Sequence, residues 1–389
     1  LAYASHDGER KHDKIKNRHE NLKEQGFYDF IVVGSGPGGG TVATRLALRG
    51  FKVLLIEAGK DYNTRNTSIP ALWPNSINDD EMRWDMMAYL FNNSVQQPTE
   101  EILYPRASAL GGCAMHNVMV GMPAHPLDWD KVAKLVDDES WNFKNMQKYW
   151  NIVENCEYCS KKKKTKFRGW VNISIPHTPI ENDVKLISLF DTVSKQLVYN
   201  PDVNHDNTYE SWFLAGNLIT KETGTRSSIY QRIKEVQKLR SNNLHVWTST
   251  FVTKIIIENK RACGVNYVKS HPSRRSDLYS ASPKSTIHQR RRASERQHSV
   301  YAKHDVIISG GVFNTPQILQ LSGVGDKKLL KKHHIKVKEH LPGVGRNMQD
   351  HHEVTYILKM KQDWNFLTGC TFGATDDDPC LAEYFETRK

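Results

Sequence analysis

The strongest constraint on the fold is a glycine-rich loop between two short apolar runs. Residues 29–33 form an apolar run of the kind found in buried parallel strands, and it leads directly into the glycines of 34–40. A second run of this kind covers 52–56 and ends at Glu57. A helix between the two runs completes the pattern, so the sequence predicts a β-α-β unit.

The helix between these runs has an expected apolar face and an expected end. Val42, Leu46 and Ala47 recur at a spacing that places them on one helical face. Arg49 supplies a positive charge to the last turn, and Gly50 is a residue that readily ends a helix. We therefore expect this face to pack on the sheet.

The glycines at positions 34, 36 and 39 fit the pattern G-x-G-x-x-G. In such a unit they provide a tight turn, close approach of a pyrophosphate to the backbone, and close contact between helix and strand. Glu57 follows the second strand, where a carboxylate accepts hydrogen bonds from ribose hydroxyls. A glycine-rich packing turn is the alternative, but it gives no reason for Glu57. The pattern predicts a dinucleotide site and leaves NAD and FAD both open.

Three later segments combine glycine turns with polar side chains. A loop-like stretch at 105–117 contains paired glycines followed by cysteine, histidine and asparagine. Residues 305–309 predict another buried strand, and 314–316 predict a helix start with asparagine as the cap and proline at the first helical position. A last segment, 341–351, carries an amide, a carboxylate and an imidazole.

These segments, in this order, resemble the glucose–methanol–choline (GMC) family of FAD-dependent oxidoreductases. The similar stretches are 31–59, 105–117, 309–325 and 343–351, and together they cover most of residues 28–360. The resemblance implies an α/β chain with a Rossmann-like FAD/NAD(P)-binding fold, a mixed sheet, and an incomplete α+β substrate-binding domain. It also implies FAD as cofactor, and oxidation of the CH–OH group of an alcohol by hydride transfer to flavin N5.

The resemblance also assigns cofactor-binding residues to this chain. His116 is implied either as a covalent attachment point for the flavin or as a residue hydrogen-bonded beside the ring, and both readings stay open. Asn117 is implied to hydrogen-bond near the flavin. The implied cofactor-binding set is Gly34, Gly36, Gly39, Glu57, Arg106, Gly111, Gly112, Cys113, His116, Asn117, Val252, Gly310 and Asp350.

The form Gly-Gly-Cys-x-x-His-Asn at 111–117 is similar to the choline-oxidising branch of the family. It favours a choline-like primary alcohol as substrate of a dehydrogenase or oxidase. This motif addresses flavin rather than substrate, so sugar and aryl alcohols stay open. The electron acceptor, whether oxygen, a quinone or a protein, is not indicated.

The resemblance implies a catalytic histidine in a C-terminal segment beyond the part matched here. The sequence ends at Lys389, so we expect the general base to lie beyond it. The histidines at 333, 334, 340, 351 and 352 are not taken as replacements, because the later motifs place them on the cofactor side or the surface. A flavin-binding remnant without turnover is therefore an alternative.

The expected domains are discontinuous. Residues 27–135 and 215–352 form the FAD-binding domain, and 136–214 with 353–389 form a partial, truncated substrate-binding (cap) domain. Residues 1–26 are a basic polar extension, 270–300 a basic surface insertion, and 354–360 a possible strand. Residues 141–157 have helical spacing, with Phe143, Met146, Trp150 and Val153 as an expected packing face.

The chain is basic, with 54 Lys and Arg against 43 Asp and Glu. Basic runs at 161–168 and 274–296 carry much of the excess and are typical of solvated loops. A nucleic-acid or anionic-surface binding protein is the remote alternative, but no RNA-binding or helix-turn-helix motif accompanies the charge, so no nucleic acid is expected. No apolar run is long enough to cross a bilayer.

Six cysteines are too few and too irregular for a disulfide framework in a chain of 389 residues. This favours a soluble protein of a reducing, intracellular compartment. Cys156 and Cys159 form a C-x-x-C pair, but a zinc site needs two more ligands, and Cys370 with Cys380 is not a second pair of that spacing. No metal is therefore expected.

Overall fold

A computed structural model gives the fold of the chain. It describes residues 27–89, 102–160, 167–175, 188, 192, 198–205, 211–212, 214–269, 297–351, 357, 359, 361 and 367–388. The predicted extension at 1–26, the insertion at 270–296, the lysines at 161–164 and most of the possible strand at 354–360 lie outside these residues. The chain forms two compact units: unit 1 comprises 1–62, 80–113 and 229–350, and unit 2 comprises 63–79, 114–228 and 351–389.

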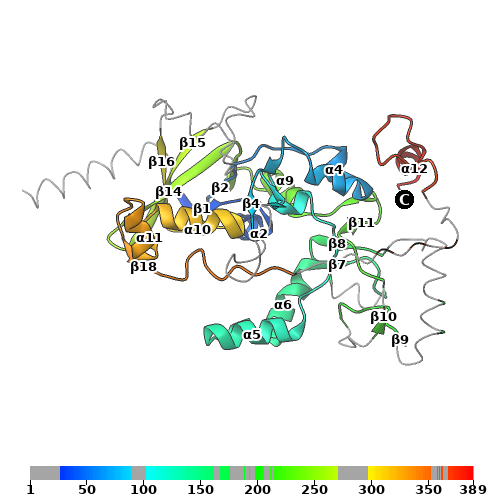
Figure 1. The fold of residues 1–389 in the computed structure, drawn as a ribbon, viewed down its shortest axis with the longest axis horizontal. Helices are drawn as coiled ribbons and strands as arrows, with labels where there is room; N and C mark the ends of the chain where they lie inside the picture. The colour runs from blue at the N-terminus through cyan, green and yellow to red at the C-terminus, as the bar shows by residue number, and fades with distance from the viewer. Residues whose placement is uncertain are drawn as a thin grey trace, which may run out of the picture. The chain divides into compact units, whose positions relative to one another are not determined.

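Unit 1 is built on a six-stranded mixed sheet in the order β13-β2-β1-β16-β15-β14 (Figure 1). The strands are β1 (Tyr28–Val33), β2 (Val53–Ile56), β13 (Leu244–Trp247), β14 (Thr250–Glu258), β15 (Arg261–Lys269) and β16 (His298–Ile308). β13, β2, β1 and the second half of β16 are parallel, whereas the first half of β16 pairs antiparallel with β15, and β15 pairs antiparallel with β14. The predicted strands at 29–33, 52–56 and 305–309 are confirmed.

The parallel strands are held in register by a fully buried core. Ile31 pairs with Leu54 and Val33 with Ile56, and each of these side chains is at most 5% exposed. Their hydrophobic cluster extends to β14 and β15. Because both faces of a parallel sheet are covered, its strands read as continuous apolar runs, which is why the sequence signal was clear.

The helix of the β-α-β unit is α2 (Pro37–Leu48), and its predicted buried face is partly wrong. Ala47 is buried, but Val42 is 37% exposed, and the buried positions are mostly small residues. The cause is close packing against α9 (Ile229–Leu239): a Cβ on Gly40 would lie 2.4 Å from the Ile229 side chain. Close contact between the two helices thus selects small residues over large apolar ones.

The helix after β16 starts earlier than predicted. It is α10 (Gly311–Leu321), with Gly310 at the N-cap and Pro316 inside the helix, so the assignment of residue 314 as cap is wrong. Gly311 has φ of 85°, a left-handed conformation that glycine adopts without cost. The chain therefore completes its turn at the two glycines, and Pro316 costs the helix one hydrogen bond.

The remaining elements of unit 1 are short. They are β3 (Arg83–Trp84), β4 (Met87–Ala88), β5 (Ile102–Leu103), β6 (Arg106–Ala107), β17 (Val324–Gly325), α11 (Lys327–Lys332) and β18 (Glu339–His340). β3 pairs antiparallel with β6, and this pairing places Trp84 opposite Arg106. The turn η2 (Gly112–Met115) follows β6 and lies across the boundary between the units in sequence.

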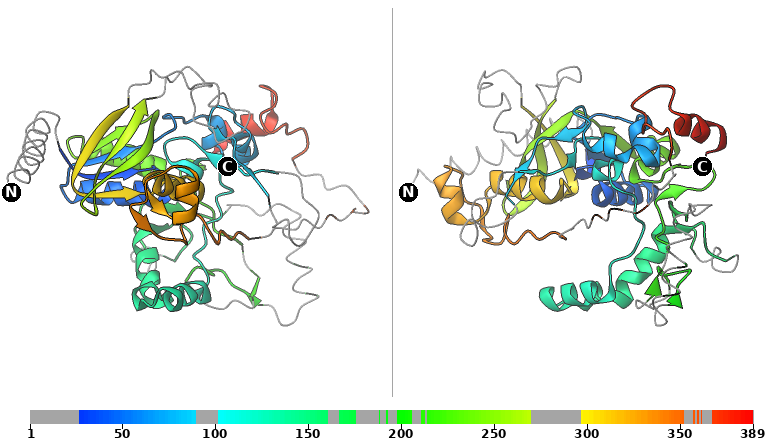
Figure 2. Two further views of the ribbon diagram at one scale, coloured as in Figure 1. Left: turned by 60° about the vertical axis from the view of Figure 1, so that its left-hand side comes forward. Right: turned by 45° about the vertical axis from the view of Figure 1, so that its right-hand side comes forward.

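Unit 2 combines short helices with short strand pairs and irregular segments (Figure 2). The helices bounded within its described residues are α3 (Arg65–Ser68), η1 (Pro70–Leu72), α4 (Trp73–Ile77), α5 (Pro126–Val136), η3 (Glu139–Trp141), α6 (Phe143–Val153) and α12 (Pro379–Thr387). Its strands are β7 (Glu154–Cys156), β8 (Val171–Ile173), β9 (Val198–Tyr199), β10 (Ser211–Trp212), β11 (Ile219–Thr220) and β12 (Thr225–Arg226). No helix within the described ranges has the length and apolar character needed to cross a membrane.

The two units divide the chain differently from the predicted domains. Residues 63–79, 114–135 and 215–228, predicted from the sequence to be in the FAD-binding domain, lie in unit 2 of this division. Two contacts hold them there: α5 packs against α6, and Val120 forms a bridge with Asn217. The boundaries therefore follow long-range pairing that spacing in the sequence does not indicate.

Four of the six cysteines are paired in the structure. Cys156 is joined to Cys159 and Cys370 to Cys380, whereas Cys113 and Cys263 are not disulfide-bonded. Both pairs close short loops within unit 2, so they are local links rather than a framework between distant elements. Neither disulfide was predicted from the sequence.

The N-cap of α12 is expected to make unit 2 sensitive to acid. Asp378 accepts five hydrogen bonds, from the backbone of Thr371, Gly373, Cys380 and Leu381 and from the Thr371 hydroxyl. These bonds, led by that of Gly373, hold the pKa of Asp378 well below its usual range, although burial opposes them. A carboxyl with a depressed folded pKa contributes stability above its unfolded value, near 3.8, and loses it as the pH falls further.

We therefore expect Asp378→Asn to lower the thermal midpoint of unit 2 at neutral pH, with the difference from the parent chain shrinking below pH ~4. Thermal unfolding at several pH values, followed by circular dichroism, tests this. The exposed neighbour Asp377 gives the matched control, since Asp377→Asn should leave the midpoint unchanged. A difference for Asp378→Asn that stays constant through the acid range would contradict the assignment.

Candidate functional site

The main cavity of unit 1 lies at the carboxyl ends of its parallel strands. It has a volume of about 570 Å³ and is lined by Val33 and Ile56, the last residues of β1 and β2, and by Ser309, which follows β16. Ligands of open α/β sheets bind at this edge. The rest of the lining comes from the glycine loop, from 84–86 and 106–113, from the start of β14, and from α10.

Two glycines of the loop are required by the fold itself. Gly34 has φ of 93°, and a Cβ there would lie 2.2 Å from the carbonyl oxygen of Ser309. A Cβ on Gly39 would lie 2.0 Å from the carbonyl oxygen of Gly34. Both distances are far inside van der Waals contact, so these glycines allow the loop, α2 and β16 to approach one another.

Gly36 has a different environment. Its φ of −61° and ψ of −176° suit any residue, and a Cβ there would meet only the Cα of Gly112, at 3.9 Å. Gly36 lines the cavity and is the N-cap of α2, so the first N–H groups of that helix lack partners within the helix. The protein itself does not require glycine here, whereas an anion bound at this helix end would.

Glu57 lies below the loop and is 6% exposed. One carboxylate oxygen accepts hydrogen bonds from the Ser35 N–H at 2.9 Å and the Ser35 hydroxyl at 2.6 Å, and the other accepts from the Gly59 N–H at 2.9 Å. Burial raises the pKa of Glu57, and these hydrogen bonds oppose the rise. Glu57 therefore fixes the loop geometry in addition to lining the cavity.

Arg106 brings a donor to the same cavity. Its Nη1 donates to the Cys113 sulfur at 3.6 Å, and the guanidinium lies 5.0 Å from the ring centre of Tyr104. Its Nε–H is buried and has no hydrogen-bond partner among the described residues. A buried donor of this kind is costly unless a ligand or water accepts from it, so the site has an unfilled requirement for an acceptor.

Another part of the cavity lining is apolar and aromatic, and it was not predicted from the sequence. Trp84 and Phe251 line the cavity with ring centres 6.3 Å apart, and Met86, Phe313 and Ile318 continue the surface. Trp84 is positioned by the pairing of β3 with β6, and Phe251 by β14. The available signal was the apolar character of these residues, which is equally typical of an ordinary core.

The structure gathers most of the predicted cofactor-binding residues of unit 1 around this cavity. Those in its lining are Gly34, Gly36, Glu57, Arg106, Gly112, Cys113, Val252 and Gly310. Three others lie outside the lining and have structural contacts instead. Gly39 packs under the loop, the Gly111 N–H donates to the Ser35 hydroxyl at 2.9 Å, and Asp350 accepts a hydrogen bond from Tyr104.

His116 and Asn117 belong to unit 2. His116 is 7% exposed and follows the turn η2. The carbonyl and the amide oxygen of Asn117 both accept from Arg226, whose guanidinium also donates to the carbonyls of Thr67, at 2.7 Å, and Ala114, at 3.2 Å. Arg226 is 1% exposed, and burial lowers its pKa to about 10. It fixes the backbone around Asn117, a role that the sequence analysis missed.

A second cavity, of about 390 Å³, lies within unit 2. Phe143, Met146, Trp150 and Val153 of α6 contribute to its lining together with Trp129 of α5. The helix predicted at 141–157 is confirmed only over 143–153, as α6, because 154–156 form the strand β7 instead. Its expected packing face is the wall of a cavity rather than a filled core, and none of its residues is buried.

Comparison with known proteins gives matches over most of the chain. The profile of the family described as GMC oxidoreductase matches residues 28–353. Ecdysone oxidase of Spodoptera littoralis is 32% identical over 336 residues, which are 83% of this chain and 50% of that protein. Oxygen-dependent choline dehydrogenase of Staphylococcus aureus (strain MSSA476) is 30% identical over 345 residues, 86% of this chain and 54% of that protein.

A solved structure has the same fold. The FAD-dependent oxidoreductase from Chaetomium thermophilum, determined with a bound fragment, superposes with a TM-score of 0.68 and 26% identity over 83% of this chain and 52% of that one. The chain thus spans about half the length of the relatives that it matches.

Proposed function

Because the chain belongs to the GMC oxidoreductase family, we propose that the cavity of unit 1 binds FAD and that the protein oxidises the CH–OH group of an alcohol. FAD supplies flavin N5 as the acceptor of a hydride. The observation that supports the site best is Gly36, since it lines the cavity at the N-terminus of α2 and the protein leaves room there for a side chain.

The residues of the cavity fit the parts of FAD that carry charge and hydrogen-bonding groups. The free N–H groups and the positive dipole end of α2 favour the pyrophosphate. Arg106 offers a buried Nε–H that requires an acceptor. The aromatic wall with Trp84 and Phe251 excludes water from a flat ring system.

Glu57 is proposed to bind the ribose of the adenosine half. A carboxylate has about four acceptor positions; Ser35 and Gly59 use three of them, and the Ala58 backbone also interacts with the carboxylate. At most one position is therefore left for a ribose hydroxyl, rather than the pair of hydroxyls considered from the sequence alone. The effect of Glu57 on affinity should therefore correspond to a single charge-assisted hydrogen bond.

Glu57→Gln is expected to weaken FAD binding by roughly tenfold to a hundredfold, since a hydrogen bond to a charged group contributes about 1.5–3 kcal/mol. Titration of flavin fluorescence with the full chain measures this. Asp61, a half-exposed carboxylate of unit 1 that pairs with Lys234 at 2.8 Å, provides the control, and Asp61→Asn should retain the parent affinity. Equal affinity of the Glu57 variant and the parent chain would remove Glu57 from the site.

His116 is proposed as a flavin contact, either covalent or hydrogen-bonded, on the basis of the family motif that it occupies. The two forms separate on acid precipitation of flavin-loaded protein. The covalent form predicts yellow colour in the pellet of the parent chain and colourless pellets for His116→Ala. Flavin entirely in the supernatant of the parent chain would eliminate the covalent form and leave the hydrogen-bonded one.

A choline-like primary alcohol is the proposed substrate, because 111–117 has the Gly-Gly-Cys-x-x-His-Asn form. Relatives named as ecdysone oxidase and choline dehydrogenase differ in substrate, so sugar and aryl alcohols are the alternatives to test. Anaerobic addition of each alcohol to flavin-loaded protein should bleach the flavin band if the chain turns over. The general base is proposed to be a histidine outside these 389 residues, in which case binding occurs without bleaching.

Among acceptors, oxygen, a quinone and a redox protein are the candidates for reoxidation of the flavin. Each is to be tested by return of the oxidised band after mixing with the reduced protein. A flavin-binding remnant is the second candidate function, and it predicts a retained flavin band that no alcohol bleaches.

A further inference from the structure

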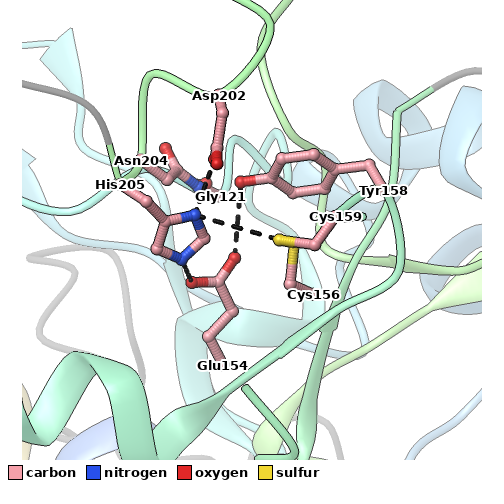
Figure 3. Close-up of a disulfide and its surroundings, with 8 residues drawn as sticks. All are labelled: Gly121, Glu154, Cys156, Tyr158, Cys159, Asp202, Asn204 and His205. Carbon is pink, nitrogen blue, oxygen red and sulfur yellow. Dashed lines mark hydrogen bonds and ion pairs between the residues drawn. A yellow bond between two sulfur atoms is a disulfide. The ribbon is translucent and has the colours of Figure 1, made fainter. Parts of the chain in front are cut away.

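A cluster of ionisable and sulfur-bearing side chains lies in unit 2 and includes no residue assigned to FAD (Figure 3). The Cys156–Cys159 disulfide is at its centre, and the His205 imidazole faces it with Nδ1 3.9 Å from the Cys159 sulfur. Asp202 lies 2.6 Å from the same Nδ1, and Glu154 lies 2.8 Å from Nε2 on the other side of the ring.

The cluster is enclosed by the protein. Cys156 and Glu154 are each 1% exposed, Cys159 is 7% exposed, and the side chain of His205 is 6% exposed. Phe167 stacks on the imidazole with ring centres 4.0 Å apart and planes 25° apart. The positions of these groups are therefore fixed by packing from β7, the turn at 201–205, and Phe167, which lies four residues before β8.

We propose that reduction of the Cys156–Cys159 disulfide converts this cluster into a binding site for a divalent cation of the zinc class. Cys156, Cys159 and His205 each offer one ligand atom, and these atoms lie within 4.8 Å of one another. A site with two thiolates and an imidazole binds zinc in preference to calcium or magnesium, which favour oxygen ligands. Asp202 contacts the same ring nitrogen but is not part of this group, so the protein supplies three ligands and the fourth position is left to water.

Glu154 has a separate role in this site. It contacts Nε2, the ring nitrogen that faces away from the sulfur atoms, at 2.8 Å. Carboxylates at this position orient metal-bound histidines and increase their basicity. Glu154 is therefore a positioning residue, whereas Cys156, Cys159 and His205 are the proposed ligands.

The sequence expectation of no metal rested on the absence of two further ligands near the C-x-x-C pair. The structure brings one of them, His205, from a turn 46 residues after Cys159, a separation at which spacing in the sequence carries no signal. The position of His205 therefore supports a metal site that spacing in the sequence did not indicate. This site exists only after reduction, because the intact disulfide offers no thiolate ligands.

The conversion is balanced by a dithiol or phosphine reductant. Two electrons break the S–S bond and two protons complete the two thiols. A dithiol supplies both protons as it becomes a disulfide, whereas a phosphine takes an oxygen atom from water, which also supplies the two protons. On metal binding both thiol protons, and any proton on the His205 ring nitrogen that becomes a ligand, are released to solvent, as ligand atoms must be deprotonated. Reoxidation by a small-molecule disulfide, which is reduced to two thiols, re-forms the Cys156–Cys159 bond and releases the metal.

The test uses Co²⁺ as a spectroscopic substitute for Zn²⁺ in the full chain carrying Cys370→Ser and Cys380→Ser. These changes remove the second paired cysteines, which with Asp378 form another possible metal group. After anaerobic reduction with a phosphine, we expect thiolate-to-cobalt charge transfer at one Co²⁺ per chain, displaced by Zn²⁺. The unreduced protein should show none of this absorption.

Variants distinguish metal coordination by these side chains from a disulfide that has only a structural role. Cys159→Ser and His205→Gln should each lose at least part of the charge-transfer or ligand-field bands, whereas Cys263→Ser, at a cysteine of unit 1 that is not disulfide-bonded, should change nothing. Glu154→Gln should keep the spectrum but weaken Co²⁺ binding by about 10- to 100-fold.

Absence of charge transfer in the reduced protein would overturn the proposal, and so would bands that survive loss of both Cys156 and Cys159. If reduction alone unfolds unit 2, recovery of its circular dichroism on addition of Zn²⁺ would support the site. Failure to recover would leave a structural disulfide and refute the metal site. None of these outcomes depends on FAD binding.

Discussion

Replacement of Gly36 by valine is expected to abolish FAD retention while unit 1 stays folded. The backbone of Gly36 is in an extended conformation open to any residue, and its added Cβ would touch only Gly112, at 3.9 Å, an ordinary contact. The valine side chain would instead fill the space at the N-terminus of α2, where the pyrophosphate is proposed to bind. Flavin absorbance after desalting, with circular dichroism in parallel, measures both parts of the prediction.

Gly343 provides the matched control for this variant. It also lies in unit 1, a Cβ there would meet nothing within 4 Å, and it is not in the lining of the cavity. Gly343→Val should therefore keep both fold and flavin. Normal flavin content in Gly36→Val would refute the assignment of the pyrophosphate to this loop.

Alanine at Gly34 or Gly39 is expected to act in the opposite way, by destabilising unit 1 whether or not FAD is present. The added Cβ would lie 2.2 Å from the Ser309 oxygen in the first case and 2.0 Å from the Gly34 oxygen in the second. Backbone atoms cannot yield as a flexible side chain does, and Gly34 also has φ of 93°. We expect a loss of about 3 kcal/mol or more in the free energy of unfolding for each variant.

Urea unfolding followed by tryptophan fluorescence tests this second prediction. Gly38 is the control from the same helix, because a Cβ there meets nothing within 4 Å. Gly38→Ala should be neutral or stabilising by up to about 1 kcal/mol, the difference in helix propensity between the two residues. Similar stability of the Gly34, Gly38 and Gly39 variants would show that the close approach in the loop does not hold.

The β-α-β unit and α10 show which parts of the fold could be predicted from the sequence and which could not. The β-α-β unit was predictable because its strands are continuous apolar runs and its loop is local. The buried face of α2 was not, because Gly40 faces α9, which lies about 190 residues later in the chain. The start of α10 was missed because the turn is completed by Gly311 in a left-handed conformation.

In the candidate site, too, residues of local motifs could be predicted and long-range contacts could not. Gly34, Gly36, Glu57 and Arg106 were predictable because each belongs to a contiguous motif. The aromatic wall was not, because Phe251 reaches the cavity only through the long-range arrangement of the sheet. His205 likewise lies near the C-x-x-C pair only in the folded chain, because 46 residues separate it from Cys159. Arg226 and Asn117 are also distant in the sequence and come into contact only in the fold.

The measurement that tests the central claim most directly is the visible absorption spectrum of the 389-residue chain after incubation with FAD and removal of unbound cofactor. We predict a retained flavin band near one flavin per chain, and its loss in Gly36→Val purified and loaded in the same way. A parent chain that is folded by circular dichroism but retains no flavin would contradict the proposal that unit 1 binds FAD.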